Sequence, residues 1–236
     1  AVNNMFPKIN LEMEDIVSSW AGLRPLIHEE GKSASELSRK DEIFTSDTGL
    51  ISIAGGKLTG YRKMAERVVN RIATKMENED DTKLKECYTE KIALCGNDDF
   101  KKFKHVEKYI AEIFGRIKSE GFTQYDARFL VTNYGKQTEI ILETYDSLKD
   151  ADNYVRMAIA ELRFGIDYEM VLNPMDFFIR RTGRLYFDID SVRSLMTPIL
   201  GEFKAIYGVD DTQILAWKEE LEAQLDEHSN FSLERV

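Results

Sequence analysis

The chain has 236 residues, 43% of them hydrophobic, so it can bury the core of one large domain or two modest ones. Its 42 acidic and 32 basic residues give a net charge of −10, which repels nucleic acid and anionic lipid in the absence of a concentrated basic patch. No apolar run approaches the ~18 residues of a membrane span, so a soluble protein without nucleic-acid partners is expected.

Cysteine and histidine are the residues that would first suggest a disulfide or a metal site. Cys87 and Cys95 are too far apart for a CxxC pair, and the three histidines show no ligand spacing. The amino end, AVNNMFPKIN, has neither the basic nor the apolar region of a signal peptide. We therefore expect reduced thiols, no metal and a cytoplasmic protein.

The first part of the chain has the composition of a sheet. Extended segments are expected at residues 16–27, 42–47 and 49–54, which are rich in β-branched and aromatic residues. The last segment leads through a glycine pair into an amphipathic helix, GGKLTGYRKMAERVVNRI. The charged stretch at residues 76–86 is almost free of apolar residues and is expected to be a linker.

Most later segments have helical period. Apolar residues from Phe103 to Ile117 recur at three- and four-residue steps and stop before Gly121. Pro198 should kink or split one of the later helices. Further helices are expected at 123–135 with Thr123 as N-cap, 136–148, 153–166, 174–187 with Asn173 and Pro174 as N-cap and N1, 190–208, and 210–225.

Together these elements predict a mainly α fold in two parts. A short α/β portion would occupy residues 1–78, and an all-α domain of about six or seven helices would occupy residues 79–236.

The turn GGKLTG is the first candidate site. It is not a P-loop, because Ile51 stands where a glycine is required and Leu58 replaces the serine or threonine after the lysine. Gly55 and Gly56 would let the backbone approach a ligand closely, and the helix that begins near Thr59 would offer its amides to an anion or a polar ring edge. A purely structural turn is an equally good interpretation of this pattern alone.

Arg24, in WAGLRPLI, is the second candidate. The proline that follows fixes the chain direction, and the planar guanidinium group can hold a phosphate through two hydrogen bonds. An ion pair with one of the many acidic residues is the competing interpretation.

Three stretches, taken together, are quite specific: LEMEDIVSSWAGLRPLI, SRKDEIF and GLISIAGGKLTGYRKMAE. They resemble the carboxyl-terminal half of the FAD-dependent glycerol-3-phosphate dehydrogenases and the closely similar bacterial α-glycerophosphate oxidases. The stretch AELRFGIDYEMVLNPMDFFIRRTGRLYF resembles the helical carboxyl-terminal domain of that family. Family members begin with a GxGxxG segment that holds the ADP part of FAD, and this sequence contains none. The resemblance implies a piece in which residues 1–78 end the flavin and substrate domains and residues 79–236 form a helical cap.

The resemblance also implies roles for particular residues. Arg24 would bind the substrate and, as the catalytic candidate, stabilise charge on the oxygen at C2, while Lys57 would be a second cation facing the same anion. Backbone groups against the flavin ring and ribityl chain would come from Gly55, Gly56, Leu58 and Thr59. His28 is expected to be a surface histidine, and Arg62 is expected to hold the turn by an ion pair.

The implied reaction is the oxidation of sn-glycerol 3-phosphate to dihydroxyacetone phosphate, with FAD taking the hydride. FAD would be held mainly by the missing half, so the piece alone is expected to bind it poorly and to be inactive. We expect O2 as the acceptor, because acidic helices such as LAWKEELEAQLDEH give no basic face for membrane association; a quinone is the alternative. The rival hypothesis is a non-catalytic module for oligomerisation or membrane docking. The sequence leaves the catalytic base and any homo-oligomer open.

The family-like motif also contains two neighbouring arginines, Arg180 and Arg181. Successive residues of a helix point about 100° apart, so both cannot face one ligand equally. Arg180 is expected to pair with Asp176 on the same face, and a structural role in docking the cap is expected for the motif.

Overall fold

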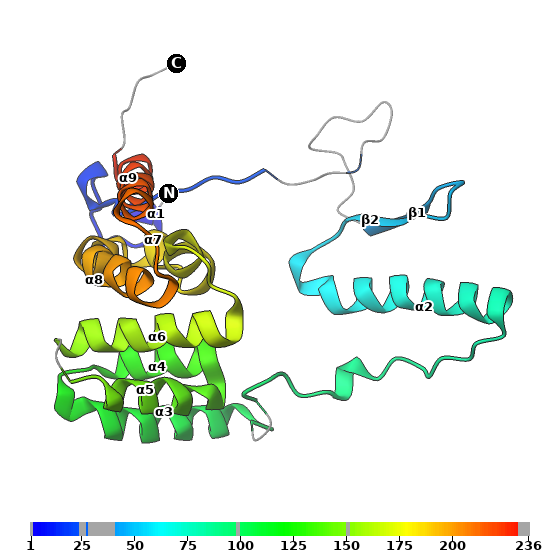
Figure 1. The fold of residues 1–236 in the computed structure, drawn as a ribbon, viewed down its shortest axis with the longest axis horizontal. Helices are drawn as coiled ribbons and strands as arrows, with labels where there is room; N and C mark the ends of the chain where they lie inside the picture. Colours follow the sequence, from blue (N-terminus) through cyan, green and yellow to red (C-terminus); the bar gives the residue numbers. More distant parts are fainter. Residues whose placement is uncertain (1, 24–26, 28–40, 98–99, 150–151, 231–236) are drawn as a thin grey trace, which may run out of the picture. The chain divides into compact units, whose positions relative to one another are not determined.

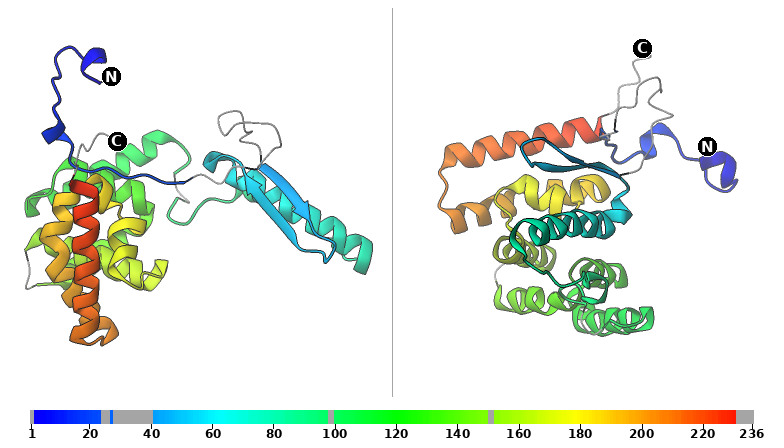
Figure 2. Two further views of the ribbon diagram at one scale, coloured as in Figure 1. Left: turned by 90° about the horizontal axis from the view of Figure 1, so that it is seen from above. Right: turned by 90° about the vertical axis from the view of Figure 1, so that its right-hand side faces the viewer.

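The structure is a computed structural model that describes residues 2–23, 27, 41–97, 100–149 and 152–230. It divides into two compact units (Figures 1 and 2). The helical unit comprises Ala1–Trp20 and Leu94–Val236, and the hairpin unit comprises Ala21–Ala93. Among the described helices, none is both long and apolar enough to span a membrane.

The hairpin unit consists of a two-stranded sheet followed by a long helix. Strands β1 (Asp41–Thr45) and β2 (Ile51–Gly55) are antiparallel, with Ile43 opposite Ile53. A 3-10 turn, η2 (Leu58–Gly60), leads into α2 (Tyr61–Asp80), and a second one, η3, covers Thr89–Lys91. No described residue of this unit is fully buried, so these elements have no closed core of their own.

Two expectations for this region are corrected. The described residues of the predicted segment 16–27, which are 16–23 and 27, form no strand. Residues 18–20 contact helices of the helical unit instead, through the Ser18 hydroxyl, the Ser19 amide and the Trp20 ring. The expected linker at 76–86 is helical as far as Asp80, because Met76, Glu77 and Glu79 favour a helix, which ends at the left-handed Asp81.

The helical unit confirms the predicted mainly α fold. Short turns of helix lie at α1 (Val2–Met5), η1 (Met13–Asp15), η4 (Lys118–Glu120) and η5 (Gly135–Gln137). The longer helices are α3 (Phe103–Ile117), α4 (Gln124–Tyr134), α5 (Thr138–Ser147), α6 (Asn153–Glu169), α8 (Ile189–Tyr207) and α9 (Asp211–Ser229). Between α6 and α8 the chain forms a π-helix, η6 (Asp176–Arg181), and the short α7 (Arg184–Phe187).

Helix α6 lies between two hydrophobic cores (Figure 1). Ala160 and Phe164 pack in the core formed with α3, α4 and α5. Ala158 and Leu162 pack in the core formed with α8 and α9. Apolar residues of α6 are therefore buried on two faces, as expected of a helix inside a protein rather than on its surface.

The segment expected as one helix at 174–187 has two parts. Its predicted start is confirmed, because the Asn173 Oδ1 accepts a hydrogen bond from the Asp176 amide (3.0 Å). The amide of Thr182 donates to the Phe177 carbonyl (3.0 Å), which is the wider spacing of a π-helix, and Gly183 then takes a left-handed conformation (φ +64°) that ends this turn.

Pro198 does not split α8, which runs unbroken from Ile189 to Tyr207. A proline inside a helix costs about 3 kcal/mol. Its neighbours Leu195, Ile199 and Leu200 are buried, and each buried aliphatic side chain contributes about 1.5–3 kcal/mol. Core packing therefore outweighs the local cost of the proline.

The predicted N-cap of α4 offers a test of local stability. Thr123 Oγ1 accepts from the Asp126 amide (3.4 Å), and Asp126 Oδ2 accepts from the Thr123 amide (2.7 Å). Thr123→Ala should lower the free energy of unfolding by about 1 kcal/mol, measured by urea denaturation. Thr132→Ala is the control, because this exposed threonine of the same helix only donates back to the Arg128 carbonyl (2.8 Å). Equal losses in the two variants would contradict a capping role.

Candidate functional site

The turn after β2 depends on two glycines. Gly55 (φ +76°) and Gly56 (φ +86°) both adopt a backbone conformation that residues with a Cβ atom rarely take. A Cβ atom at Gly56 would also lie 2.6 Å from Met64 Sδ and 3.2 Å from Asp41 Cβ. The glycine pair therefore lets β2 turn sharply while it stays close to β1 and α2.

The residues after the glycines present exposed backbone donors. The amide of Gly60 donates to the Lys57 carbonyl (2.8 Å), and that of Tyr61 donates to the Leu58 carbonyl. The amides of Leu58 and Thr59 have no acceptor among the described residues, and they lie at the positive end of the 20-residue α2. Exposed backbone donors of this kind can bind an anion or the polar edge of a ring.

Lys57 borders an open hollow of about 360 Å³ near the start of α2. Lys63 and Arg67 also border it, but Lys63 binds Glu66 (2.7 Å) and Arg67 binds Asp41. Lys57 is exposed and has no carboxylate partner in the described part of the chain. Of these three cations it is the one whose charge is not neutralised by a carboxylate, so it can bind an anion.

Arg62 forms the ion pair that was expected of it. Its Nη1 lies 3.1 Å from Glu66 Oε2 and 3.3 Å from Thr89 Oγ1, which connects the first turn of α2 to η3. The hydrogen bond from Lys63, together with the charges of Lys63 and Arg62, lowers the pKa of Glu66. Arg62 is therefore engaged in holding the turn.

Arg24 and His28 lie outside the described residues. The chain shortly before them, at residues 18–20, contacts the helical unit. The Trp20 ring stacks on Tyr186 (centroids 4.9 Å apart), and the Ser19 amide donates to the His228 carbonyl (3.0 Å). Ser18 Oγ donates to the Leu185 carbonyl (3.3 Å). Residues 18–20 are thus anchored on α7 and the end of α9, immediately before the GLRPL stretch.

The two neighbouring arginines point to different partners, as predicted. Arg180 Nη1 lies 2.6 Å from Asp176 Oδ1, which confirms the expected pair. Arg181 donates to the Glu169 carbonyl, and its Nε lies 3.8 Å from Glu169 Oε2. Both contacts connect parts of the helical unit to one another, in keeping with a structural role.

Sequence reasoning missed a buried polar network in the helical unit. Glu161 Oε2 accepts from Arg184 Nη2 (2.7 Å), and Glu161 Oε1 accepts from the Tyr134 hydroxyl (3.0 Å). The side chains of Glu161 and Arg184 are only 1% and 9% exposed. The available signal was the lone acid in AIAEL, an otherwise apolar stretch.

Burial acts in opposite directions on the pKa values of Tyr134 and Arg184. Burial and the charge of Glu161 both raise the pKa of Tyr134, so its hydroxyl stays protonated as a donor. Burial, the largest single influence, lowers the pKa of Arg184, but the charges and hydrogen bonds of Glu161 and Tyr154 together raise it above its ordinary value. Arg184 therefore stays charged inside the protein.

The buried pair and the exposed pair should differ strongly in their contribution to stability. Arg184→Met leaves the Glu161 carboxylate buried without its cation, so the free energy of unfolding should fall by about 3 kcal/mol or more. Arg180→Met removes an exposed pair with Asp176 and should cost about 0.5 kcal/mol or less. Urea denaturation of both variants checks this, and similar losses would mean that the buried pair is solvated.

Comparison with known proteins identifies relatives over most of the chain. The family model described as the C-terminal domain of alpha-glycerophosphate oxidase matches residues 87–214. The aerobic glycerol-3-phosphate dehydrogenase of Bacillus subtilis is 42% identical over 203 residues, covering 85% of this chain and 36% of the relative. The same enzyme of Staphylococcus saprophyticus is 38% identical over 228 residues, covering 96% of this chain and 41% of the relative.

A solved structure is also similar to this chain over most of its length. The crystal structure of glycerol-3-phosphate dehydrogenase from Bacillus halodurans complexed with FAD matches with a TM-score of 0.79 and 35% identity. The match covers 99% of this chain and 45% of that one, so the chain spans less than half the length of these relatives. The resemblance inferred from the GLRPL and GGKLTGYRK stretches is confirmed. The chain belongs to the family of the C-terminal domain of alpha-glycerophosphate oxidase.

Proposed function

We propose that this chain is the carboxyl-terminal part of an FAD-dependent enzyme that oxidises sn-glycerol 3-phosphate to dihydroxyacetone phosphate. The observation that carries the proposal is the structural agreement with the FAD-bound Bacillus halodurans dehydrogenase over 99% of this chain. The names of the Bacillus and Staphylococcus relatives support the same substrate.

The residues of the glycine turn would divide two tasks between them. Lys57, whose charge is not paired in the described part of the chain, would bind the substrate phosphate through a charge-assisted hydrogen bond. The backbone of Gly55, Gly56, Leu58 and Thr59 would face the flavin. Bound FAD would accept the hydride from C2 of the substrate.

Arg24 is proposed as the second cation of the substrate site. The planar guanidinium group would hold the phosphate or stabilise charge on the C2 oxygen as the hydroxyl proton leaves. Support comes from the GLRPL stretch itself, whose resemblance to the FAD-dependent glycerol-3-phosphate dehydrogenases implies a substrate-binding arginine at this position.

We propose O2 as the electron acceptor, which would make hydrogen peroxide the second product. Support comes from the acidic character of the chain and of helices such as α9, which offers no basic face to a membrane. A quinone is the alternative acceptor, and the curated relatives are called dehydrogenases. The experiment below distinguishes these acceptors.

The test joins the amino-terminal part of the Bacillus subtilis relative to this chain. Without oxygen, sn-glycerol 3-phosphate should bleach the flavin absorbance of this chimaera, and air should restore it rapidly with release of peroxide. Slow recovery in air would favour a quinone as the acceptor. Bound flavin that is not bleached would contradict the substrate assignment and favour a non-catalytic helical module. The chain alone, expected to bind FAD poorly, is the control.

Lys57 provides a residue-level prediction for the same chimaera. Lys57→Met should raise the KM for sn-glycerol 3-phosphate by about 10- to 100-fold, as expected for the loss of a charge-assisted hydrogen bond. Lys63→Met removes a cation of the same hollow that already binds Glu66, so its KM should change by about threefold or less. Steady-state kinetics of both variants check this. Equal increases in KM in the two variants would mean that the overall positive charge of the hollow, and not Lys57 itself, accounts for substrate binding.

A further inference from the structure

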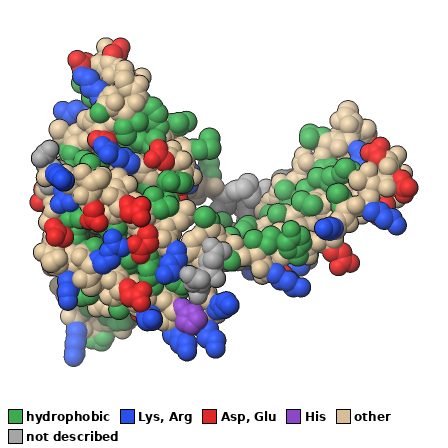
Figure 3. All heavy atoms as spheres, turned by 60° about the horizontal axis from the view of Figure 1, so that its bottom comes forward, with side chains coloured by type: hydrophobic (Ala, Val, Ile, Leu, Met, Phe, Trp, Pro, Cys, Tyr) green, Lys and Arg blue, Asp and Glu red, His purple; other side chains and the backbone are tan. Residues whose placement is uncertain are grey.

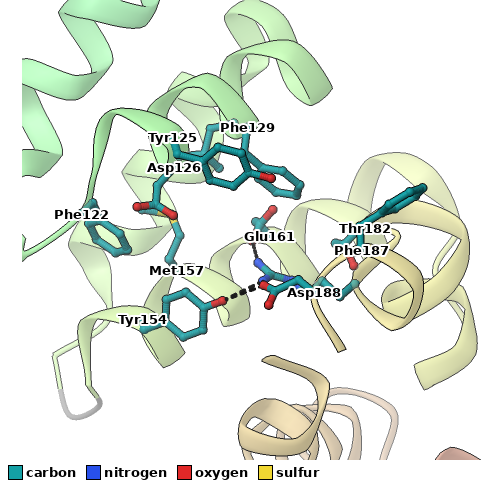
Figure 4. A pocket seen from close by; sticks show the side chains of 12 residues that line it. Phe122, Tyr125, Asp126, Phe129, Tyr154, Met157, Glu161, Thr182, Phe187 and Asp188 are labelled. Atoms are coloured by element: carbon teal, nitrogen blue, oxygen red, sulfur yellow. Dashed lines mark hydrogen bonds and ion pairs between the residues drawn. The ribbon is translucent and has the colours of Figure 1, made fainter. Parts of the chain in front are cut away.

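A pocket of about 320 Å³ lies within the helical unit, between α4, α6 and residues 182–188 (Figure 4). Its volume is at the lower end of the range of small-molecule sites, which is about 300–1,000 Å³. Lys57 and the glycine turn, which are the described residues of the proposed flavin and substrate site, do not line it. The pocket is therefore a separate candidate, and its occupant has to be inferred from its own side chains.

The buried wall of the pocket contains an incompletely bonded cation. Arg184 donates through Nη2 to Glu161 (2.7 Å) and through Nη1 to the Tyr154 hydroxyl (3.1 Å). Its Nε is buried and has no hydrogen-bond partner among the described residues. A buried donor without an acceptor is costly, so a water molecule held beside a ligand in the pocket would be stabilised by accepting from it.

Negative charge is in excess around the pocket. Among the described residues, Glu161, Asp126 and Asp188 line it, against one cation, Arg184. Arg184 is paired with Glu161 and, at a longer distance, with Asp188, so the described lining keeps a formal excess of negative charge. Asp188 Oδ2 binds the Tyr154 hydroxyl (3.3 Å) and lies 3.5 Å from Arg184 Nη1. The Asp188 side chain is 52% exposed, so a ligand can reach it.

Aromatic rings complete the lining. Phe129 and Tyr154 lie 5.6 and 5.7 Å from the guanidinium carbon of Arg184, so these rings already flank one cation. Tyr125 and Phe187 are 73% and 74% exposed, which is high for such large rings, and both belong to the pocket lining. Aromatic faces attract ammonium and guanidinium groups, and their area also suits an apolar ligand body.

We propose that this pocket binds a small organic cation, in which an ammonium or guanidinium group is attached to an apolar body. The cationic group would bind between Asp126 and Asp188, and the apolar body would pack against Tyr125 and Phe187. An anion such as a phosphate is disfavoured, because Arg184, the one cation among the described lining residues, is already paired with Glu161 and Asp188. The proposal is independent of the oxidoreductase function.

The probe is 2-phenylethylammonium, titrated into the 236-residue chain and followed by calorimetry. It should bind at a single site, whereas 3-phenylpropionate, which has a similar shape and the opposite charge, should bind at least about tenfold more weakly. Neutral 2-phenylethanol should fall between them. Absence of binding by the cation, or equal binding of the two ions, would overturn the proposal.

Two variants locate the site. Asp188→Asn should weaken binding of 2-phenylethylammonium by about fivefold, the effect of one partly solvated charge at contact distance. Asp190→Asn is the matched control, because this 89% exposed carboxylate of α8 lies outside the pocket and its loss changes the net charge equally. Equal weakening by both variants would show a general charge effect and would contradict the site.

If Asp188→Asn disturbs folding, Tyr125→Ala provides a second test of the same site. The exposed Tyr125 ring makes little contribution to the core, so the variant should fold, which its thermal unfolding curve checks. Loss of the ring should weaken binding of the cation by about two- to fivefold, as for an exposed cation–π contact. Unchanged affinity in this variant would place the cation elsewhere.

Discussion

The ion pair between Glu161 and Arg184 is the interaction on which the helical unit depends. Glu161 lies on α6, which has one hydrophobic core on each side, and Arg184 begins the short α7 between the π-helix and α8. Tyr134 of α4 completes the hydrogen bonding of the carboxylate. A charge buried this deeply is tolerated only when its partner and hydrogen bonds are in place, so the pair requires these segments to be positioned together. It also provides the polar wall of the pocket.

The two units differ in how many of their side chains are buried, and in how many of their polar groups are paired, within the unit itself. The helical unit has two closed cores and an extensive set of cross-helix hydrogen bonds. The hairpin unit, in its described residues, has no fully buried side chain, and its glycine turn presents exposed amides and an uncompensated lysine. A short hairpin beside a single helix cannot bury enough apolar surface to be strongly stable. This contrast is consistent with the relatives, in which the matched region is less than half of the protein.

Local interactions account for the features that were correctly predicted from sequence. The limits of α3, the Thr123 cap of α4, the Asn173 cap and the pair between Asp176 and Arg180 each join residues at most four positions apart. Such contacts follow from backbone geometry once the helix is assumed. The glycine turn was likewise recognised from its residues, and Gly55 and Gly56 do have the left-handed conformations that require glycine.

By itself, then, the sequence determined the helical class, the family and the local caps and turns, because these depend on periodicity and on neighbours along the chain. Only the tertiary structure decided that α8 passes through Pro198 unbroken, that residues 18–20 bind helices rather than a sheet, and that Glu161 meets Arg184. The same is true of the pocket, whose lining extends from Phe122 to Asp188. In each case the energy comes from burial or pairing between residues distant in the chain, and no local pattern specifies which distant partner is available.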